Sequence, residues 1–166
     1  MYCSNAIANF NKPNVKGSIK FHECCNKKDG VIVSFDLYDL KPNKTSAIHI
    51  HEYGDDSEGC KSLGGHFNPT NKQHGSIYIN IKDSHAGDMI NNFTTDQYGR
   101  FKMRYFDPRL RISGDVRFSI LGRSVVIHEG VDDLGLGGNA ESKITGNAGG
   151  RMACSLIGIS KPGPVD

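Results

Sequence analysis

The alternation of apolar and polar residues predicts β-strands along much of the chain. Between residues 15 and 22, the side chains of Val15, Ile19 and Phe21 fall on one face and polar side chains on the other. Side chains alternate across a strand, so this period of two indicates a half-buried strand. Residues 31–37 repeat the pattern with their apolar side chains inward. We expect further strands at residues 7–10, 46–52, 92–95, 101–105, 124–128 and 153–160.

About eight short strands and no long segment with a helical period predict an all-β, antiparallel sandwich or barrel. The length of 166 residues suits one domain, residues 1–166. Two stretches, residues 53–91 and 129–151, do not fit as strands. Loops of more than about 15 residues are uncommon in compact domains unless they are functional. We therefore look for the chemistry in these two loops.

Composition narrows the choice of partners. The chain carries 20 glycines and a net charge of +2, which is too small to indicate nucleic acid or an anionic membrane as a partner. It has no apolar stretch near the roughly 18 residues of a membrane span. Its first residues have no basic segment followed by an apolar one, so we expect a cytoplasmic protein.

The five cysteines do not form an even disulfide framework, and one or two bridges is the most we expect. Cys24 and Cys25 are adjacent, and we interpret them as free thiols in a surface turn. The residues themselves assign no role to Cys3.

Six of the seven histidines lie in or beside the two long loops, and only His22 stands apart, as a solvated strand residue. His49 and His51 are two residues apart on a predicted strand, so both rings face the same side. Two neighbouring imidazoles can chelate a borderline metal. The alternative is a pair of surface histidines.

The first long loop contributes His66, His74, His85 and Asp88. Three imidazole nitrogens and one carboxylate oxygen make a closed tetrahedral zinc set. Such a site would also explain how so long a loop stays ordered. The alternative is a polar loop with chance histidines. His128 ends a predicted strand and directly precedes the second loop.

Four segments together are similar to the metal-site segments of copper–zinc superoxide dismutases, and the resemblance runs in order from about residue 5 to residue 160. The segments are His49-Ile50-His51-Glu52-Tyr53-Gly54-Asp55, Gly65-His66-Phe67-Asn68-Pro69, His128-Glu129-Gly130-Val131-Asp132-Asp133-Leu134-Gly135 and Gly146-Asn147-Ala148-Gly149-Gly150-Arg151-Met152-Ala153-Cys154.

The resemblance implies an eight-stranded Greek-key β-sandwich or barrel with two long functional loops, and a superoxide dismutase activity. Superoxide would be converted to oxygen and hydrogen peroxide by a redox-cycling copper, bridged through His66 to a structural zinc. The implied copper ligands are His49, His51, His66 and His128. The implied zinc ligands are His66, His74, His85 and Asp88.

The resemblance also assigns roles outside the metal ligands. Asp132 would join the copper ligand His49 to the zinc ligand His74. Arg151 would guide the superoxide anion, because a guanidinium stays charged and presents a fork of donors. Cys60 and Cys154 would form an intrasubunit disulfide.

The resemblance further implies a two-fold homodimer, with contacts at residues 53–54, 121–122 and 156–159. Gly150 and Met152 flank Arg151 where many family members carry a proline that is linked to a copper chaperone. We therefore hypothesise that this chain acquires copper without that chaperone.

Three segments depart from the family pattern. The spacing from His74 to His85 is two residues longer, with an unusually apolar insertion at residues 76–81, and the loop between residues 107 and 122 is also about two residues longer. In the second long loop, Ala140 replaces an acid and Lys143 is displaced by one position. We expect the chemistry to survive with altered steering of the anion.

Two readings compete with the enzyme. One is a non-enzymatic copper-delivery relative of the same fold, and the other is a metal-buffering sandwich that only holds zinc. Neither needs every ligand position and Arg151 to be filled, as they are here.

Overall fold

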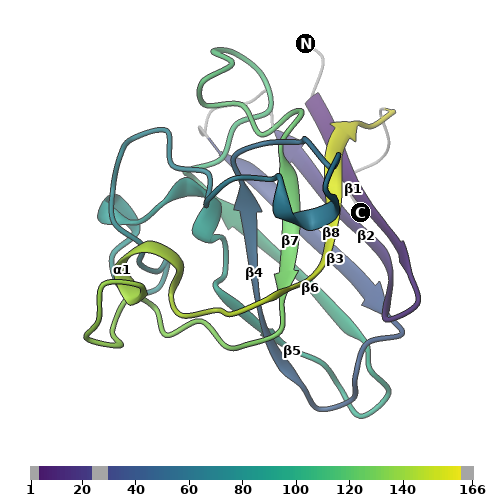
Figure 1. Ribbon diagram of the computed structural model, residues 1–166. Coiled ribbons are helices and arrows are strands. Elements are labelled where there is room, and N and C mark those ends of the chain that lie inside the picture. Colours follow the sequence, from purple (N-terminus) through teal and green to yellow (C-terminus); the bar gives the residue numbers. More distant parts are fainter. Residues whose placement is uncertain (1–3, 24–29, 162–166) are drawn as a thin grey trace.

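The computed structural model describes residues 4–23 and 30–161 (Figure 1). Its strands are β1 (Ser4–Lys12), β2 (Val15–Glu23), β3 (Val31–Tyr38), β4 (Thr45–His51), β5 (Asn92–Thr94), β6 (Phe101–Asp107), β7 (Ser124–His128) and β8 (Arg151–Ile159). Three short 3-10 helices, η1 (Gly59–Lys61), η2 (Ile81–Asp83) and η3 (Ala86–Asp88), lie in the first long loop, and α1 (Ser142–Thr145) lies in the second. The predicted all-β fold is confirmed.

The strands form one antiparallel sheet in the order β5-β4-β7-β8-β1-β2-β3-β6, which curls into a nearly closed barrel. The edge strands β5 and β6 approach each other across the interior, where the rings of Phe93 and Phe101 lie 5.0 Å apart. Aromatic rings at this separation pack favourably. The two rings pack between β5 and β6, which are not hydrogen-bonded to each other.

The barrel core follows the predicted alternation. Val31, Val33, Phe35 and Leu37 are all buried along β3, and Ile19 is fully buried on the neighbouring β2. Burial of a large aliphatic or aromatic side chain contributes roughly 1.5–3 kcal/mol. These apolar faces therefore determine which way each strand turns.

The last strand differs from its prediction. Residues 153–160 were expected to form an inner strand, but β8 is buried on one face only. Leu156 is 42% exposed and Ile159 is 83% exposed, while Ile157 between them is buried. The apolar run is continuous in sequence, but alternation in a strand turns Leu156 away from the core. Ile159 shares the face of Ile157 and is exposed as the last residue of the strand. β8 also starts two residues earlier than predicted, so Arg151 belongs to a strand.

Some predictions fall outside the described residues, namely the two thiols Cys24 and Cys25, the residue Cys3 and most of the hairpin connection at 26–30. His22 is only half-exposed, and its Nδ1 is 2.6 Å from Oδ1 of Asn5. Within residues 4–23 and 30–161, no helix is long and apolar enough to cross a membrane.

Candidate metal centre

The two faces of β4 have different roles: one packs in the core and the other carries histidines. Ile48 and Ile50 point into the barrel core, and His49 and His51 point outward, yet all four are buried. The outward face is covered by the two long loops, which lie on the same side of the barrel in Figure 1. The histidines are therefore enclosed between the sheet and the loops.

Backbone hydrogen bonds bring the first long loop back along β4. Phe67 N–H donates to the carbonyl of Ile50 at 2.8 Å, and Gly87 N–H donates to the carbonyl of Phe67 at 2.8 Å. Gly87 must be a glycine, because a Cβ there would collide with the Ile50 carbonyl and lie 2.8 Å from the Phe67 nitrogen. This close packing places His66, next to Phe67, beside His51, with which it forms an isolated bridge.

His51 and His128 face each other with nitrogens that have no proton to share. His51 Nδ1 lies 3.0 Å from the carbonyl of Gly64, and His128 Nδ1 lies 3.1 Å from that of Gly149. A carbonyl only accepts, so Nδ1 carries the proton in both neutral rings. The two Nε2 atoms, 3.3 Å apart, therefore both present lone pairs. Two facing lone pairs suit a cation between them and make no hydrogen bond.

His49 and His66 complete this set. His49 Nε2 lies 2.6 Å from Oδ2 of Asp132, so its proton is on Nε2. The remaining nitrogens, Nδ1 of His49 and Nε2 of His66, are buried and have no hydrogen-bond partner among the described residues. Buried polar atoms are rarely left unpaired. The four donor atoms of His49, His51, His66 and His128 lie within 4.8 Å of one another and fit a metal ion.

A second set surrounds one carboxylate oxygen. Nδ1 of His66, His74 and His85 lies 3.0, 2.9 and 3.0 Å from Oδ1 of Asp88. The far nitrogen of His85 faces the carbonyl of Lys72 at 3.0 Å, which directs the lone pair of its Nδ1 toward the group. All four residues are buried. Three nitrogens and one oxygen, closed to solvent, match the donor set of a structural zinc.

Asp132 joins the two sets. Its Oδ2 lies 2.6 Å from Nε2 of His49, and its Oδ1 lies 2.9 Å from Nε2 of His74. Asn91 also donates to Oδ2 from Nδ2, at 3.1 Å. His49, His74 and Asp132 are close enough to form a third candidate group. We interpret this group as a hydrogen-bonded bridge, because it uses the nitrogens that face away from the two sets.

Burial keeps the first set neutral. It lowers the pKa of His49 to about 4 and that of His51 to about 2, and it also lowers the pKa of His66 and His128. Desolvation disfavours a charged ring. These nitrogens are therefore available to a metal across the whole neutral range.

The second set is held by opposite charge. Burial lowers the pKa of His74, but hydrogen bonds to Asp132 and Asp88 outweigh it and raise that pKa to about 9. Burial raises the pKa of Asp88, but the surrounding rings of His66, His74 and His85 hold it well below its usual range. Asp132 is likewise held low by His49 and His74, against its burial. A divalent cation would replace the charge that the His74 proton supplies.

A β-bulge places Arg151 next to His128. The pairing of β7 with β8 shifts register between Ile127 and His128, so that His128 faces Arg151. Bulges redirect side chains in this way near functional sites. The guanidinium donates to the carbonyl of Cys60 at 2.6 Å and to that of Gly64 at 2.5 Å.

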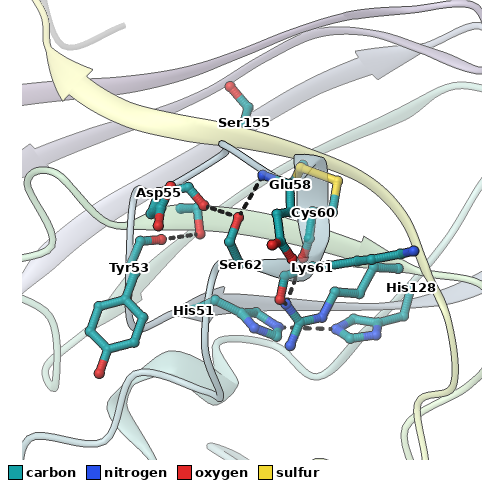
Figure 2. Close-up of a disulfide and its surroundings, with 12 residues drawn as sticks. His51, Tyr53, Asp55, Glu58, Cys60, Lys61, Ser62, His128 and Ser155 are labelled. Carbon is teal, nitrogen blue, oxygen red and sulfur yellow. Dashed lines mark hydrogen bonds between the residues drawn. A yellow bond between two sulfur atoms is a disulfide. The ribbon is translucent and has the colours of Figure 1, made fainter.

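The Cys60–Cys154 disulfide, expected from the family resemblance, is confirmed. It joins η1 of the first loop to β8, and Figure 2 shows it above the facing rings of His51 and His128. The bridge therefore holds in place the Cys60 carbonyl, one of the two carbonyls that bind Arg151.

A cleft of about 380 Å³ opens onto the first set. It is lined by His51, Gly65, His66, His128, Glu141, Thr145, Asn147, Gly149 and Arg151. A larger cleft of about 830 Å³ lies between residues 81–86 and 108–118 and contains none of these histidines. The smaller cleft is the candidate active site, because it alone of the two exposes metal-binding nitrogens beside a cation.

The structure shows where the displaced Lys143 and the insertion at residues 76–81 lie. Lys143 donates to the carbonyl of Gly135 at 2.5 Å and lines a different hollow from the cleft, together with His74 and Leu136. Glu141 lines the cleft instead. In the insertion, Ser76 is buried, while Tyr78 and Ile79 are 67% and 56% exposed.

Sequence reasoning missed three residues around Asp132, namely Asn91, Asn92 and Gly146. Gly146 has a φ of +66°, and a Cβ there would collide with both His74 and Asp132. Asn91 also has a positive φ, of 59°. Adjacent asparagines shortly after a candidate ligand, and a glycine between two candidate ligand segments, were the available signals.

Comparisons with known proteins agree with this geometry. Residues 15–157 match the family model for copper/zinc superoxide dismutase. The chain is 43% identical over 157 residues to the superoxide dismutase [Cu-Zn] of Paramecium bursaria Chlorella virus 1, covering 95% of this chain and 79% of that protein. It is 42% identical over 146 residues to the Saccharomyces cerevisiae protein of the same name, covering 88% and 91%.

A solved structure has the same fold. The crystal structure of the clock protein EA4 superposes with a TM-score of 0.86 at 38% identity, covering 95% of each chain. Copper and zinc are the metals of the matched family, and the two donor sets fit them. The chain belongs to the copper/zinc superoxide dismutase family.

Proposed function

We propose that this protein catalyses the disproportionation of two superoxide anions and two protons to oxygen and hydrogen peroxide. Copper would be held by His49, His51, His66 and His128. Zinc would be held by His66, His74, His85 and Asp88. The observation that carries the proposal is the pair of donor sets that share His66, with unpaired nitrogens converging on one point beside Arg151. Among the described residues, every ligand position of the family pattern is filled.

Bound copper supplies one-electron oxidation and reduction, and its preference for imidazole nitrogens suits the all-histidine set. Zinc has no redox chemistry and would hold the loop and the shared ring in place. The protein contributes the orientation of the anion, its attraction into the cleft and the handling of protons.

Arg151 would bind the anion. Its guanidinium lies in the lining of the cleft with His51 and His128, and two backbone carbonyls hold it there. Because Gly64 accepts from both His51 Nδ1 and Arg151, the carbonyl of Gly64 fixes the cation relative to the metal ligands. A positioned cation in a cleft with low-dielectric walls raises the capture rate of a small anion.

His66 would supply a proton. Its Nε2 is buried, has no hydrogen-bond partner among the described residues, and belongs to a ring that lines the cleft. Nε2 could carry a proton whenever it is not bound to the metal, and because burial lowers the pKa of His66, that proton would be readily given up to the peroxide product.

The test is the rate of superoxide consumption by the purified protein loaded with copper and zinc, measured by pulse radiolysis. Arg151→Ala should reduce the rate by at least about tenfold, while Arg151→Lys should retain more of it. Arg104→Ala, on the outward face of β6, is the matched control. A rate at the level of free solution with both metals bound would refute the activity and favour a copper-delivery or metal-buffering role.

We also propose a homodimer. Tyr53, Leu156 and Ile159 are exposed apolar side chains at or beside the segments expected to form the contact, at 52%, 42% and 83% exposure. Exposed apolar groups gathered on one face are typical of protein interfaces. Light scattering at micromolar concentration should give about twice the chain mass of 18.2 kDa. A mass of one chain would refute the dimer.

Three further expectations remain proposals. Residues 1–166 would form a single domain, which limited proteolysis would test. Gly150 and Met152 beside Arg151 support copper loading without a chaperone, and an inactive protein in a chaperone-null host would contradict this. A cytoplasmic location is testable by cell fractionation.

A further inference from the structure

We propose that Asn92 is a positioning residue that fixes the backbone of Asp132 and, through it, the geometry of both metal sites. This inference rests on the proposed assignment of the two metal sites. Asn92 is not a candidate metal ligand, and both hydrogen bonds of its side chain go to the backbone of Asp132.

The side-chain amide of Asn92 imitates a neighbouring peptide group. Its Oδ1 accepts from the backbone N–H of Asp132 at 2.8 Å, and its Nδ2 donates to the backbone carbonyl of Asp132 at 2.9 Å. One side chain thus satisfies both backbone polar groups of one residue. Asn92 begins β5, which is an edge of the sheet, so this pairing ties the second long loop to the barrel where no further strand follows.

The carboxylate of Asp132 is fully used by the metal centre and its surroundings. Oδ1 accepts from Nε2 of His74 at 2.9 Å and from the N–H of Leu134 at 2.6 Å. Oδ2 accepts from Nε2 of His49 at 2.6 Å and from Asn91 at 3.1 Å. The side chain is therefore held by the two histidines, and the pair of hydrogen bonds from Asn92 holds the backbone.

The position of Asp132 matters because one carboxylate orients two rings. Outer partners of metal-binding histidines fix both ring orientation and the position of the proton. If the Asp132 backbone moved away from β5, the hydrogen bonds to His49 and His74 would lengthen together. Both donor sets would then lose alignment, although no ligand had been replaced.

The test compares Asn92→Val with Thr94→Val in the fully metallated protein. Valine suits a strand, so β5 should keep its pairing with β4. Thr94 lies two residues along the same strand, and its variant loses an exposed hydrogen bond to Thr45 that does not involve Asp132. Zinc loss to a chelator and the visible and paramagnetic resonance spectra of bound copper are measured, with far-ultraviolet dichroism as the check on folding.

For Asn92→Val we expect zinc loss to be about tenfold faster than in the wild type and the copper spectrum to change. Removing a group that hydrogen-bonds to a metal ligand typically weakens metal binding by about 10- to 100-fold, and Asn92 acts one step further from the metal, so we expect the lower value. Thr94→Val should match the wild type in both. Asn92→Asp, which keeps the acceptor and removes the donor, provides an isosteric second variant if the valine variant does not fold, and should also speed zinc loss.

Equal zinc loss and identical copper spectra in the folded Asn92 variants, Thr94→Val and the wild type would overturn the proposal. A wild-type protein that fails to bind two metals at these residues would instead refute the proposed function. The two failures are therefore distinguishable.

Discussion

Loss of the disulfide should both destabilise the protein and loosen its anion site. The bridge joins residues 94 positions apart, from η1 to β8. In the chain-entropy description, closing a loop of about that size in the unfolded state is worth about 4.7 kcal/mol, and measured losses in small proteins are typically about 2–5 kcal/mol. We therefore expect Cys154→Ser to reduce the free energy of unfolding by about 4 kcal/mol.

The functional effect follows from which contacts depend on the bridge. Near the loop's two ends, Tyr53 N–H still donates to the Leu63 carbonyl and Glu52 N–H to that of Gly65, both at 2.9 Å. Among the described residues, no backbone hydrogen bond joins η1 to β8, so once the disulfide is gone only the Arg151 side chain itself connects the two. The Cys60 carbonyl should then move away from Arg151, while the Gly64 carbonyl stays. Superoxide turnover should fall several-fold with both metals still bound.

The assay is urea unfolding of the metal-free protein, because bound metal would add its own binding energy to the stability. With a slope of about 2 kcal/mol per molar urea, the midpoint should fall by about 2 M. Ser155→Ala is the matched control, since it alters the adjacent residue of β8 and removes one exposed hydrogen bond to Asn9. Reduction of the wild type should reproduce the variant. A midpoint within about 0.3 M of the wild type would refute the reasoning, since it would mean less than about 1 kcal/mol.

The remaining predictions concern the metal sites and the cleft. Gly146→Ala should weaken zinc binding by at least about tenfold in chelator competition, because a Cβ would push His74 from Asp132, whereas Gly138→Ala, also at positive φ but with open space around it, should not. Zinc binding to the metal-free protein at pH 7 should release about one proton from His74, because the pKa of this ring is about 9. Calorimetry in buffers of different ionisation enthalpy should show that the number of protons released declines as the pH rises through 9. A release that does not change between pH 7 and pH 10 would contradict this prediction. Glu141→Gln should raise the rate of superoxide turnover about two- to threefold at low ionic strength, because it removes a negative charge from the cleft. This gain should fade near 0.15 M salt, where surface charges are screened. A salt dependence equal to that of the wild type would argue against any steering by Glu141.

Local patterns in the sequence were sufficient for the strands and for most candidate ligands. The period of two along residues 15–22 and 31–37 identified the buried faces, because each strand residue faces the core or not by its parity alone. His49 and His51 were paired for the same reason. The clustering of histidines in two long loops indicated a metal site, because so many ligand-type side chains rarely gather in a loop that must otherwise stay ordered.

Several features depend on contacts between distant segments, which no local pattern contains. Arg151 reaches His128 only through a bulge in the pairing of β7 with β8, and the displaced Lys143 turns from the cleft to the carbonyl of Gly135. The apolar run of β8 was expected to be buried, but whether its outward face is covered depends on which other segments pack against it. The alternation of apolar and polar residues does not show whether a second chain covers the exposed side.

The surroundings of Asp132 best illustrate the difference between what the sequence determines and what the tertiary structure decides. Its part as the link between His49 and His74 was available from the family resemblance, since ligand segments retain their order and spacing. Asn92 lies 40 positions away in sequence, and its amide becomes a partner only when the edge strand β5 and the second loop come together. Sequence periodicity determines which face a side chain occupies, whereas tertiary structure decides which distant backbone group that side chain meets.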